Sequence, residues 1–237
     1  MDSSGYANLY ALQDEALAAI FNEPAGFYLT GGTALSRFYL GHRYSDDLDL
    51  FTHDVGIFGD AFRLVYSKIQ KRWPDLELEV DARDFKRLRI LADGMTLKLD
   101  FVADRVGRIG LPERVGTVYV DTIRKILGNK LCAIMGRDEA RDVADLLFIA
   151  RKRQFSWSSV LAEVADKETF QLEDLLFRLS TFPVALLSTV PFIQEEPIVL
   201  YSRILDTLRD DLARFGENTV AEPDSAEIGR ASCRERV

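Results

Sequence analysis

Two stretches decide the fold of this chain: Leu29-Thr30-Gly31-Gly32-Thr33-Ala34-Leu35 and Ser45-Asp46-Asp47-Leu48-Asp49-Leu50-Phe51. The apolar run from Phe27 to Thr30 is typical of a buried strand, and the two glycines after it allow a sharp turn. Thr33 can cap the helix that residues 34–40 predict. Because backbone N–H groups at a helix start bind phosphate, Gly31, Gly32 and Thr33 are candidate nucleotide-binding residues.

The second stretch alternates acidic and apolar side chains. Successive side chains of a strand point to opposite faces, so Asp47 and Asp49 share one face with Ser45. Acidic residues are depleted in strands, and a cation between the two carboxylates is the best reason to keep them side by side. The alternative is an ordinary turn followed by a solvated acidic loop. Because both features occur together, we favour a nucleotide and Mg²⁺ site.

Composition indicates a soluble globular protein. The chain has 237 residues, 47% of them hydrophobic, which suits one large domain or two smaller ones. No apolar run approaches the ~20 residues of a membrane span, and the N-terminus lacks the pattern of a signal peptide, so we expect a cytoplasmic protein. The cysteines, Cys132 and Cys233, suggest neither a disulfide framework nor a zinc site, and Cys132 fits core packing.

The formal net charge of −8 argues against a general nucleic-acid coat. Local basic clusters remain, and together they would provide a positive face for an RNA end. The alternative for each is a solvated helix or strand face. The clusters are Lys68-Lys71-Arg72, Lys86-Arg87-Arg89 and Arg151-Lys152-Arg153.

The pattern along the chain predicts an α+β fold, with a mixed first domain over residues 1–119 and a helical domain over residues 120–216. Residues 217–237 form a polar tail, whose end lacks periodicity and suggests disorder or a cloning scar. Helices are expected at 9–21, 58–73, 121–135, from a cap at Asp138 through Arg151, and at 170–187 and 200–215. Strands are expected at 27–30, 45–51, 76–80, 88–91 and 96–102, the last two joined by a hairpin at Asp93-Gly94.

A third carboxylate is expected on the strand Thr96-Leu97-Lys98-Leu99-Asp100-Phe101. The period of two places Lys98 and Asp100 on one face. If this strand neighbours the Asp47 strand, Asp100 joins the metal site, which for two Mg²⁺ ions needs a further carboxylate. The alternative is an exposed polar face of an amphipathic strand.

Lys130 is the next candidate. It lies within the apolar stripe of the helix over residues 121–135, and a buried ammonium group needs an anionic partner. That partner is either a bound triphosphate or a carboxylate of Asp142 or Asp145; a lysine whose head reaches water is the third reading. Pairing with Asp145 requires a turn, which Gly136 can provide by ending one helix and Asp138 by capping the next.

Four blocks of sequence together look like the AbiEii/AbiGii toxin family of nucleotidyltransferases. They are Gly31-Gly32-Thr33-Ala34-Leu35, His42-Arg43-Tyr44-Ser45-Asp46-Asp47-Leu48-Asp49-Leu50-Phe51, Lys98-Leu99-Asp100-Phe101, and Lys130 with Arg141-Asp142-Val143-Ala144-Asp145. The resemblance implies a polymerase-beta-like nucleotidyltransferase fold, a small mixed sheet with flanking helices, followed by a helical C-terminal domain.

The resemblance also implies roles for individual residues. Gly32 and Ser45 would contact the triphosphate, Asp47 and Asp49 would ligate Mg²⁺, and Lys130 and Asp145 would be a further active-site pair. Asp100 would be the third metal carboxylate that the superfamily uses.

Together these features predict a Mg²⁺-dependent enzyme that moves a nucleoside monophosphate from an NTP to the 3′ hydroxyl of an RNA or tRNA. Relatives of this kind are toxins of toxin–antitoxin or abortive-infection systems, which implies a cognate antitoxin as a partner. Two alternatives remain: a nucleotidyltransferase acting on a protein side chain or small molecule, and an inactive module that only binds a partner.

Overall fold

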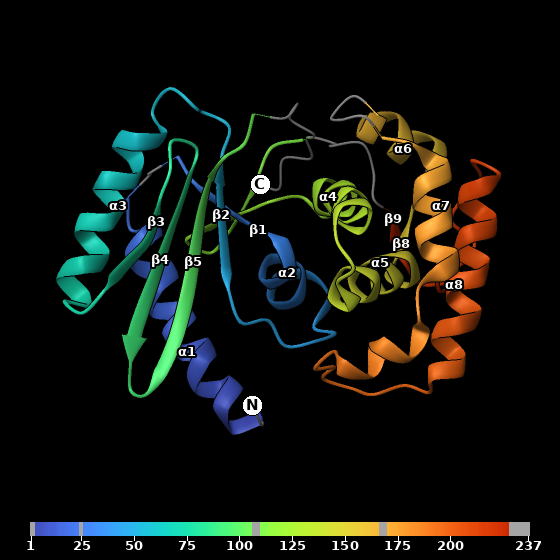
Figure 1. Cartoon of the computed structure of the whole chain (residues 1–237), viewed down its shortest axis with the longest axis horizontal. Helices are drawn as coiled ribbons and strands as arrows, with labels where there is room; N and C mark the ends of the chain where they lie inside the picture. Colours follow the sequence, from blue (N-terminus) through green and yellow to red (C-terminus); the bar gives the residue numbers. More distant parts are fainter. Residues whose placement is uncertain (1–2, 24–25, 106–109, 166–169, 228–237) are drawn as a thin grey trace. The chain divides into compact units, whose positions relative to one another are not determined.

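The computed structural model describes residues 3–23, 26–105, 110–165 and 170–227. The chain divides into two compact units (Figure 1). The sheet unit comprises Met1–Phe38, Tyr44–Val106 and Pro112–Asp121. The helical unit comprises Tyr39–Arg43, Gly107–Leu111 and Thr122–Val237.

The described strands of the sheet unit form one mixed sheet, in the order β3-β4-β5-β2-β1-β7-β6. Its strands are β1 (Tyr28–Thr30), β2 (Leu48–Thr52), β3 (Glu77–Asp81), β4 (Phe85–Ala92), β5 (Met95–Ala103), β6 (Glu113–Val115) and β7 (Val118–Val120). β2 runs parallel to β5 and β1 parallel to β7, whereas the other pairs are antiparallel. The predicted mixed sheet is confirmed, and β6 and β7 are strands that the sequence pattern did not reveal.

Helices lie beside this sheet: α1 (Ser3–Phe21), α2 (Gly31–Ala34) and α3 (Phe58–Arg72). α2 continues directly into a π-helix over Leu35–Leu40. Apolar side chains of β2 and β5 line up in register on one face, where the Phe101 ring packs 5.2 Å from that of Phe62 in α3. Because side chains alternate along a strand, Asp49 and Asp100 lie on the other face.

The hairpin between β4 and β5 has the expected turn. Asp93 and Gly94 both have positive φ, at 50° and 74°, and Ala92 pairs with Met95 on either side of them. Two such residues in succession define the tight turn whose twist suits adjacent antiparallel strands.

The helical unit contains α4 (Ile123–Gly136), α5 (Ala140–Lys152), α6 (Trp157–Ala165), α7 (Leu172–Thr181), a 3₁₀ helix (Val184–Thr189) and α8 (Ile198–Ala213). A helical C-terminal part is therefore confirmed. Thr122 caps α4 through its side chain, which accepts a hydrogen bond from the backbone N–H of Lys125. Gly136 ends α4 as predicted, but Asp138 does not cap α5: the residue before α5 is Glu139, and Asp138 instead pairs with Arg178 at 2.6 Å.

The first part of the polar tail is folded against the helical unit, which its composition did not predict. The side-chain amide of Asn218 donates hydrogen bonds to the carbonyls of Ala150 and Arg153, and Thr219 bonds the carboxylate of Asp211. A short strand β9 (Ala226–Glu227) pairs with β8 (Arg153–Gln154). Residues 228–237 lie outside the described part of the chain.

Two further expectations can be compared with the structure. Within the described residues, none of the helices is both long and apolar enough to cross a membrane. Cys132, expected in the core, is half-buried, and Cys233 lies outside the described residues.

Candidate active site

Two carboxylates of the sheet unit face each other across neighbouring strands. In the parallel pairing of β2 and β5, Asp49 lies directly opposite Asp100. Neighbouring strands are about 4.8 Å apart, so these two side chains emerge side by side on one face. The condition under which Asp100 could join the metal site, that its strand neighbours the strand of Asp49, is therefore met.

Asp47 lies one residue before β2, on the same side as Asp49. Its carboxylate pairs with the ammonium group of Lys98 at 2.6 Å. The two side chains are 31% and 33% exposed, so water and ions can reach this pair. The burial pattern of β2, with Leu48 and Leu50 buried and Asp49 partly exposed, confirms the predicted period of two within the strand. The strand begins at Leu48 and not at Ser45 as predicted, so Ser45 and Asp47 lie in the segment before it.

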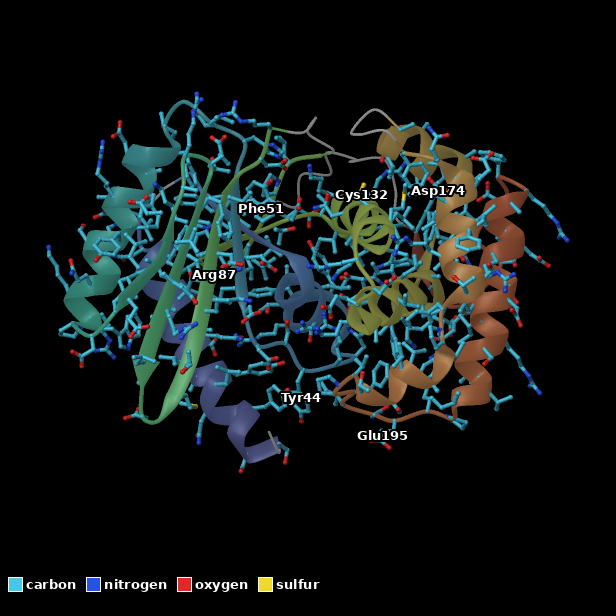
Figure 2. The ribbon with its side chains drawn as sticks, in the orientation of Figure 1. Tyr44, Phe51, Arg87, Cys132, Asp174 and Glu195 are labelled. Atoms are coloured by element: carbon cyan, nitrogen blue, oxygen red, sulfur yellow. The ribbon has the colours of Figure 1, made fainter. Side chains whose placement is uncertain are left out.

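Arg87, which lies on β4 (Figure 2), holds the Asp100 carboxylate. Its guanidinium group donates two hydrogen bonds, of 2.7 and 2.8 Å, to the two oxygens of the Asp100 carboxylate. This hydrogen bonding to Asp100 raises the pKa of Arg87. Sequence reasoning had placed Arg87 only in a basic cluster; the signal it missed is that Arg87 lies opposite Asp100 in the hairpin. We call Asp47, Asp49, Asp100, Lys98 and Arg87 the carboxylate cluster.

Gly31 brings the start of α2 against this cluster. A Cβ atom on Gly31 would overlap Oδ2 of Asp49, so the carboxylate would have to move away. Its φ of +71° also lies in the region that favours glycine. Because α2 begins at Gly31, the N–H groups of Gly31, Gly32 and Thr33 belong to the first helical turn, where no partner exists within the helix.

The predicted cap is wrong in its detail. Thr33 lies inside α2, and the cap position is Thr30, whose side chain makes no capping hydrogen bond. The hydroxyl of Thr33 instead lies 2.8 Å from that of Ser45 and also bonds the backbone carbonyl of Asp47. Thr33 therefore joins the glycine turn to the segment that carries Ser45 and Asp47.

Lys130 is at the centre of a second charged group, in the helical unit. Its ammonium group lies 2.7 Å from a carboxylate oxygen of Asp142 and 2.5 Å from one of Asp145. Only 9% of the Lys130 side chain is exposed, so its head does not reach bulk water. Of the partners that the sequence left open, the structure shows the two carboxylates, brought close by the turn between α4 and α5.

Asp145 has further partners from the segment that precedes the acidic stretch. Arg43 donates to both of its oxygens, at 2.6 and 2.9 Å, and Nε2 of His42 lies 2.8 Å from Oδ1. Nδ1 of His42 is buried without a hydrogen-bond partner among the described residues. We call Lys130, Asp142, Asp145, His42, Arg43 and Arg137 the lysine cluster.

The charges in the lysine cluster determine its protonation. Burial opposes ionisation of Asp145, but Lys130 and Arg43 outweigh it and hold the pKa of that carboxyl well below its ordinary value. Burial likewise opposes ionisation of Asp142, yet Lys130 and Arg137 lower its pKa. Burial lowers the pKa of His42, so its imidazole is neutral at pH 7. The cluster thus contains two ionised carboxylates between cations.

Most members of the basic clusters suggested by the sequence are paired with carboxylates. Lys68, Arg72, Lys86, Arg87, Arg89, Arg151 and Lys152 each form an ion pair with a carboxylate. The lysines and arginines of these pairs therefore have most of their charge compensated within the protein.

The fold and the paired carboxylates define a class of α+β protein with a mixed sheet and a helical C-terminal part. Two solved Helicobacter pylori structures share the fold. JHP933 is 21% identical, with a TM-score of 0.61 and coverage of 91% of this chain and 95% of that chain. A "putative nucleotidyltransferase" is 22% identical, with a TM-score of 0.58 and coverage of 90% and 98%.

The family follows from the sequence match. The model of the nucleotidyl transferase AbiEii toxin family, type IV TA system, matches residues 15–224, and the chain belongs to this family. An uncharacterised protein of Aquifex aeolicus is 35% identical over 131 residues, which are 53% of this chain. The match spans 58% of the length of that relative.

Proposed function

We propose that this protein is a Mg²⁺-dependent nucleotidyltransferase that transfers a nucleoside monophosphate from an NTP to the 3′ hydroxyl of an RNA, with tRNA as the favoured acceptor. The observation that carries the proposal is the register of Asp49 with Asp100, with Gly31 packed against the Asp49 carboxylate. The family match supports the reaction class, and the acceptor rests on the resemblance alone.

The residues present fit Mg²⁺. In proteins Mg²⁺ is usually held by one or two carboxylates, with substrate phosphates and water completing its shell. Asp47 and Asp49 supply two hard oxygen donors on one side of the sheet. No ready-made group of three acidic, histidine or cysteine ligands occurs among the described residues, so the phosphates of the NTP would complete the site. Bound there, Mg²⁺ would neutralise charge on the triphosphate.

The chain's own side chains have separate tasks in the transfer. The acceptor oxygen would attack the α-phosphorus, the bond to pyrophosphate would break and pyrophosphate would leave, and the hydroxyl proton would pass to water. The first turn of α2, with Gly31, Gly32 and Thr33, would bind phosphate oxygens. Asp100 would orient the acceptor hydroxyl; both of its oxygens are held by Arg87, so accepting a proton would require one of these bonds to open.

Lys130 and Asp145 enter the proposal differently. Each charge of the pair is already compensated within the lysine cluster, which explains the burial of Lys130 without a triphosphate. The catalytic and nucleotide-binding roles that the resemblance implies for them stay a prediction. A cognate antitoxin, implied by the type IV toxin–antitoxin assignment of the family, is part of the same proposal.

A four-NTP transfer assay tests the proposal. Purified protein is incubated with each labelled NTP, Mg²⁺, total cellular RNA and lysate. Label on RNA that depends on one NTP and disappears with a chelator supports the proposal. Label confined to protein or small molecules would show that the acceptor is a protein or a small molecule and not RNA. No transfer and no NTP binding in any condition would leave only a partner-binding module.

Asp49→Asn identifies the site responsible. We expect at least a ~10³-fold loss of transfer, because a carboxylate needed in the transition state is removed. The melting temperature should stay within a few degrees, since the side chain keeps its size. Asp60→Asn is the matched control, because the Asp60 side chain is 75% exposed in α3. Full activity in Asp49→Asn would remove this mechanism.

A further inference from the structure

The segment that carries Ser45 and Asp47 is held by side chains of the first helix. Residues 44–47 have no regular secondary structure, and they lie directly before β2. A loop of this kind needs partners for its backbone groups wherever it is buried. Ser45 is buried, and the described partners of the loop come mainly from α1.

Gln13 makes the central contacts. Its side-chain nitrogen donates one hydrogen bond of 2.9 Å to the carbonyl of Ser45 and another of 3.2 Å to the carbonyl of Asp46. Both amide hydrogens are therefore used. Gln13 has no exposed surface, which is unusual for this residue type and shows that its polar atoms are committed to the protein.

The orientation of the Gln13 amide is determined by its neighbours. Its oxygen accepts a hydrogen bond of 3.1 Å from Arg37, which in turn pairs with Asp14 at 2.6 Å. Turning the amide over would place its oxygen against two carbonyls and its nitrogen against a guanidinium group, and each contact would then be repulsive. The side chain thus has one orientation that satisfies the network.

Tyrosines of α1 hold the same loop at its start. The hydroxyl of Tyr10 accepts a hydrogen bond of 3.2 Å from the backbone N–H of Ser45. Tyr44 stacks on Tyr6 of α1 with 4.0 Å between ring centroids and lies beside that helix (Figure 2). From the other side, Thr33 bonds Ser45 and the carbonyl of Asp47.

We propose that Gln13 is a positioning residue for the donor site: by holding the carbonyls of Ser45 and Asp46 it sets where the Asp47 carboxylate lies relative to Asp49. This inference rests on the proposed function for its effect on catalysis. Gln13 touches neither nucleotide nor metal. Its effect passes through two peptide groups, and displacements of about 1 Å in such a site cost about 100-fold in rate.

Gln13→Glu is the direct test. The substitution keeps size and shape and can still pair with Arg37, but it replaces the donating nitrogen by an oxygen that repels both carbonyls. We expect kcat/KM for the NTP to fall by ~10-fold to ~100-fold, with a higher Mg²⁺ concentration at half-maximal rate. Gln70→Glu is the matched control, because it makes the same chemical change at an exposed position of α3.

Amide hydrogen exchange gives a readout that does not depend on activity. Exchange should become faster in the peptide covering residues 44–50 of Gln13→Glu and stay unchanged elsewhere in the chain. Uniformly faster exchange with a lowered melting temperature would mean that Gln13 only stabilises the fold, and this would overturn the proposal. So would unchanged exchange at 44–50, or unchanged Mg²⁺ dependence, in a folded variant.

Tyr10→Phe is a milder second variant that decides the matter if Gln13→Glu does not fold. It removes the acceptor for the N–H of Ser45 and keeps the aromatic ring. A smaller shift in the same direction supports positioning by α1, and no shift in exchange or in Mg²⁺ dependence overturns it. If the wild-type protein transfers no nucleotide, the proposed function fails, while the exchange experiment still tests the role of Gln13.

Discussion

The carboxylate cluster and the lysine cluster use the same kinds of side chain at very different burial. In the sheet unit, the Asp47 and Lys98 side chains are about one third exposed. In the helical unit, the Asp145 side chain has no exposed surface and that of Lys130 is 9% exposed. The first cluster can exchange a partner with water or a ligand, whereas Lys130, Asp142 and Asp145 at the centre of the second are shielded from water.

The balance of charge differs as well. Three carboxylates and two cations leave the carboxylate cluster with one negative charge, which suits the binding of a further cation. In the lysine cluster, two carboxylates face the buried cations Lys130 and Arg43, and Arg137 lies at the exposed rim. With Arg137 counted, the lysine cluster has one positive charge, but both of its buried carboxylates already pair with cations inside the protein. We therefore expect the loss of one partner there to destabilise the fold, and we expect the carboxylate cluster to contribute to chemistry.

The largest effect is expected from removing one charge of the lysine cluster. Asp145→Asn removes the ionised carboxylate that accepts two hydrogen bonds from the buried Arg43, and breaking such a buried pair costs about 3–5 kcal/mol of the free energy of unfolding. Asp100→Asn is the counterpart in the other cluster. Because the Arg87 side chain is 31% exposed and can turn to water, we expect a cost below about 1 kcal/mol. Urea unfolding of both variants measures the difference.

The pH dependence of the free energy of unfolding tests whether Asp145 is ionised and paired in the fold. The pKa of Asp145 is lowered in the fold, since burial is outweighed by Lys130 and Arg43, so its contribution is present at neutral pH and is lost as pH falls through the folded pKa. The acid-side loss of stability should be smaller in Asp145→Asn than in the wild type. Equal costs for Asp145→Asn and Asp100→Asn would contradict the contrast between the clusters.

A smaller effect is expected from a substitution at Gly31, and it concerns activity. Gly31→Ala introduces a Cβ against the Asp49 carboxylate at a positive φ, so α2 and the carboxylate must move apart. We expect kcat/KM for the NTP to fall about 100-fold. Gly59→Ala is the control, because a Cβ there meets no atom within 4 Å, and alanine is a better helix former in α3. Transfer assays with both variants measure the effect.

The result for Gly31→Ala shows whether activity depends on the position of the Asp49 carboxylate and not only on its presence. Asp49 itself is unchanged in Gly31→Ala, so a large loss would show that the distance between α2 and the carboxylate matters. Activity equal to that of Gly59→Ala would mean that the glycine turn is only a turn, as the plainer reading of the sequence has it.

The sequence predicts local features of the fold well, because they depend on neighbouring residues. Alternating side chains revealed the faces of β2 and β5, and Asp93-Gly94 revealed the hairpin. The short strands β6 and β7 were missed because three residues carry too little periodicity. Asp138 was wrongly predicted as a cap because its partner, Arg178, is 40 residues away in the chain.

The dependence on neighbouring residues also explains which residues of the candidate site the sequence reveals. Asp47, Asp49 and Lys130 are visible from spacing alone, because the two aspartates alternate with leucines and Lys130 lies within an apolar helical stripe. Gln13 and Arg87 are not, because each looks like an ordinary polar residue of an amphipathic element. Their roles come from hydrogen bonds to residues 32 and 13 positions away in the chain, which no local pattern reveals.

The smallest effect is expected at Lys98, where the access of cations to the carboxylate cluster can be measured directly. Lys98 pairs with Asp47 and so competes with any cation that binds there. Lys98→Ala should lower the Mg²⁺ concentration at half-maximal binding about fivefold, the equivalent of ~1 kcal/mol for one partly exposed charge. Lys68→Ala, which removes an ion pair between Lys68 of α3 and Glu23, should leave this Mg²⁺ concentration unchanged. Calorimetric titration of both variants with Mg²⁺ and a non-hydrolysable NTP measures this. Weaker Mg²⁺ binding in Lys98→Ala would instead indicate that Lys98 binds the triphosphate. The negative charge of the carboxylate cluster would then not explain the attraction of the cation.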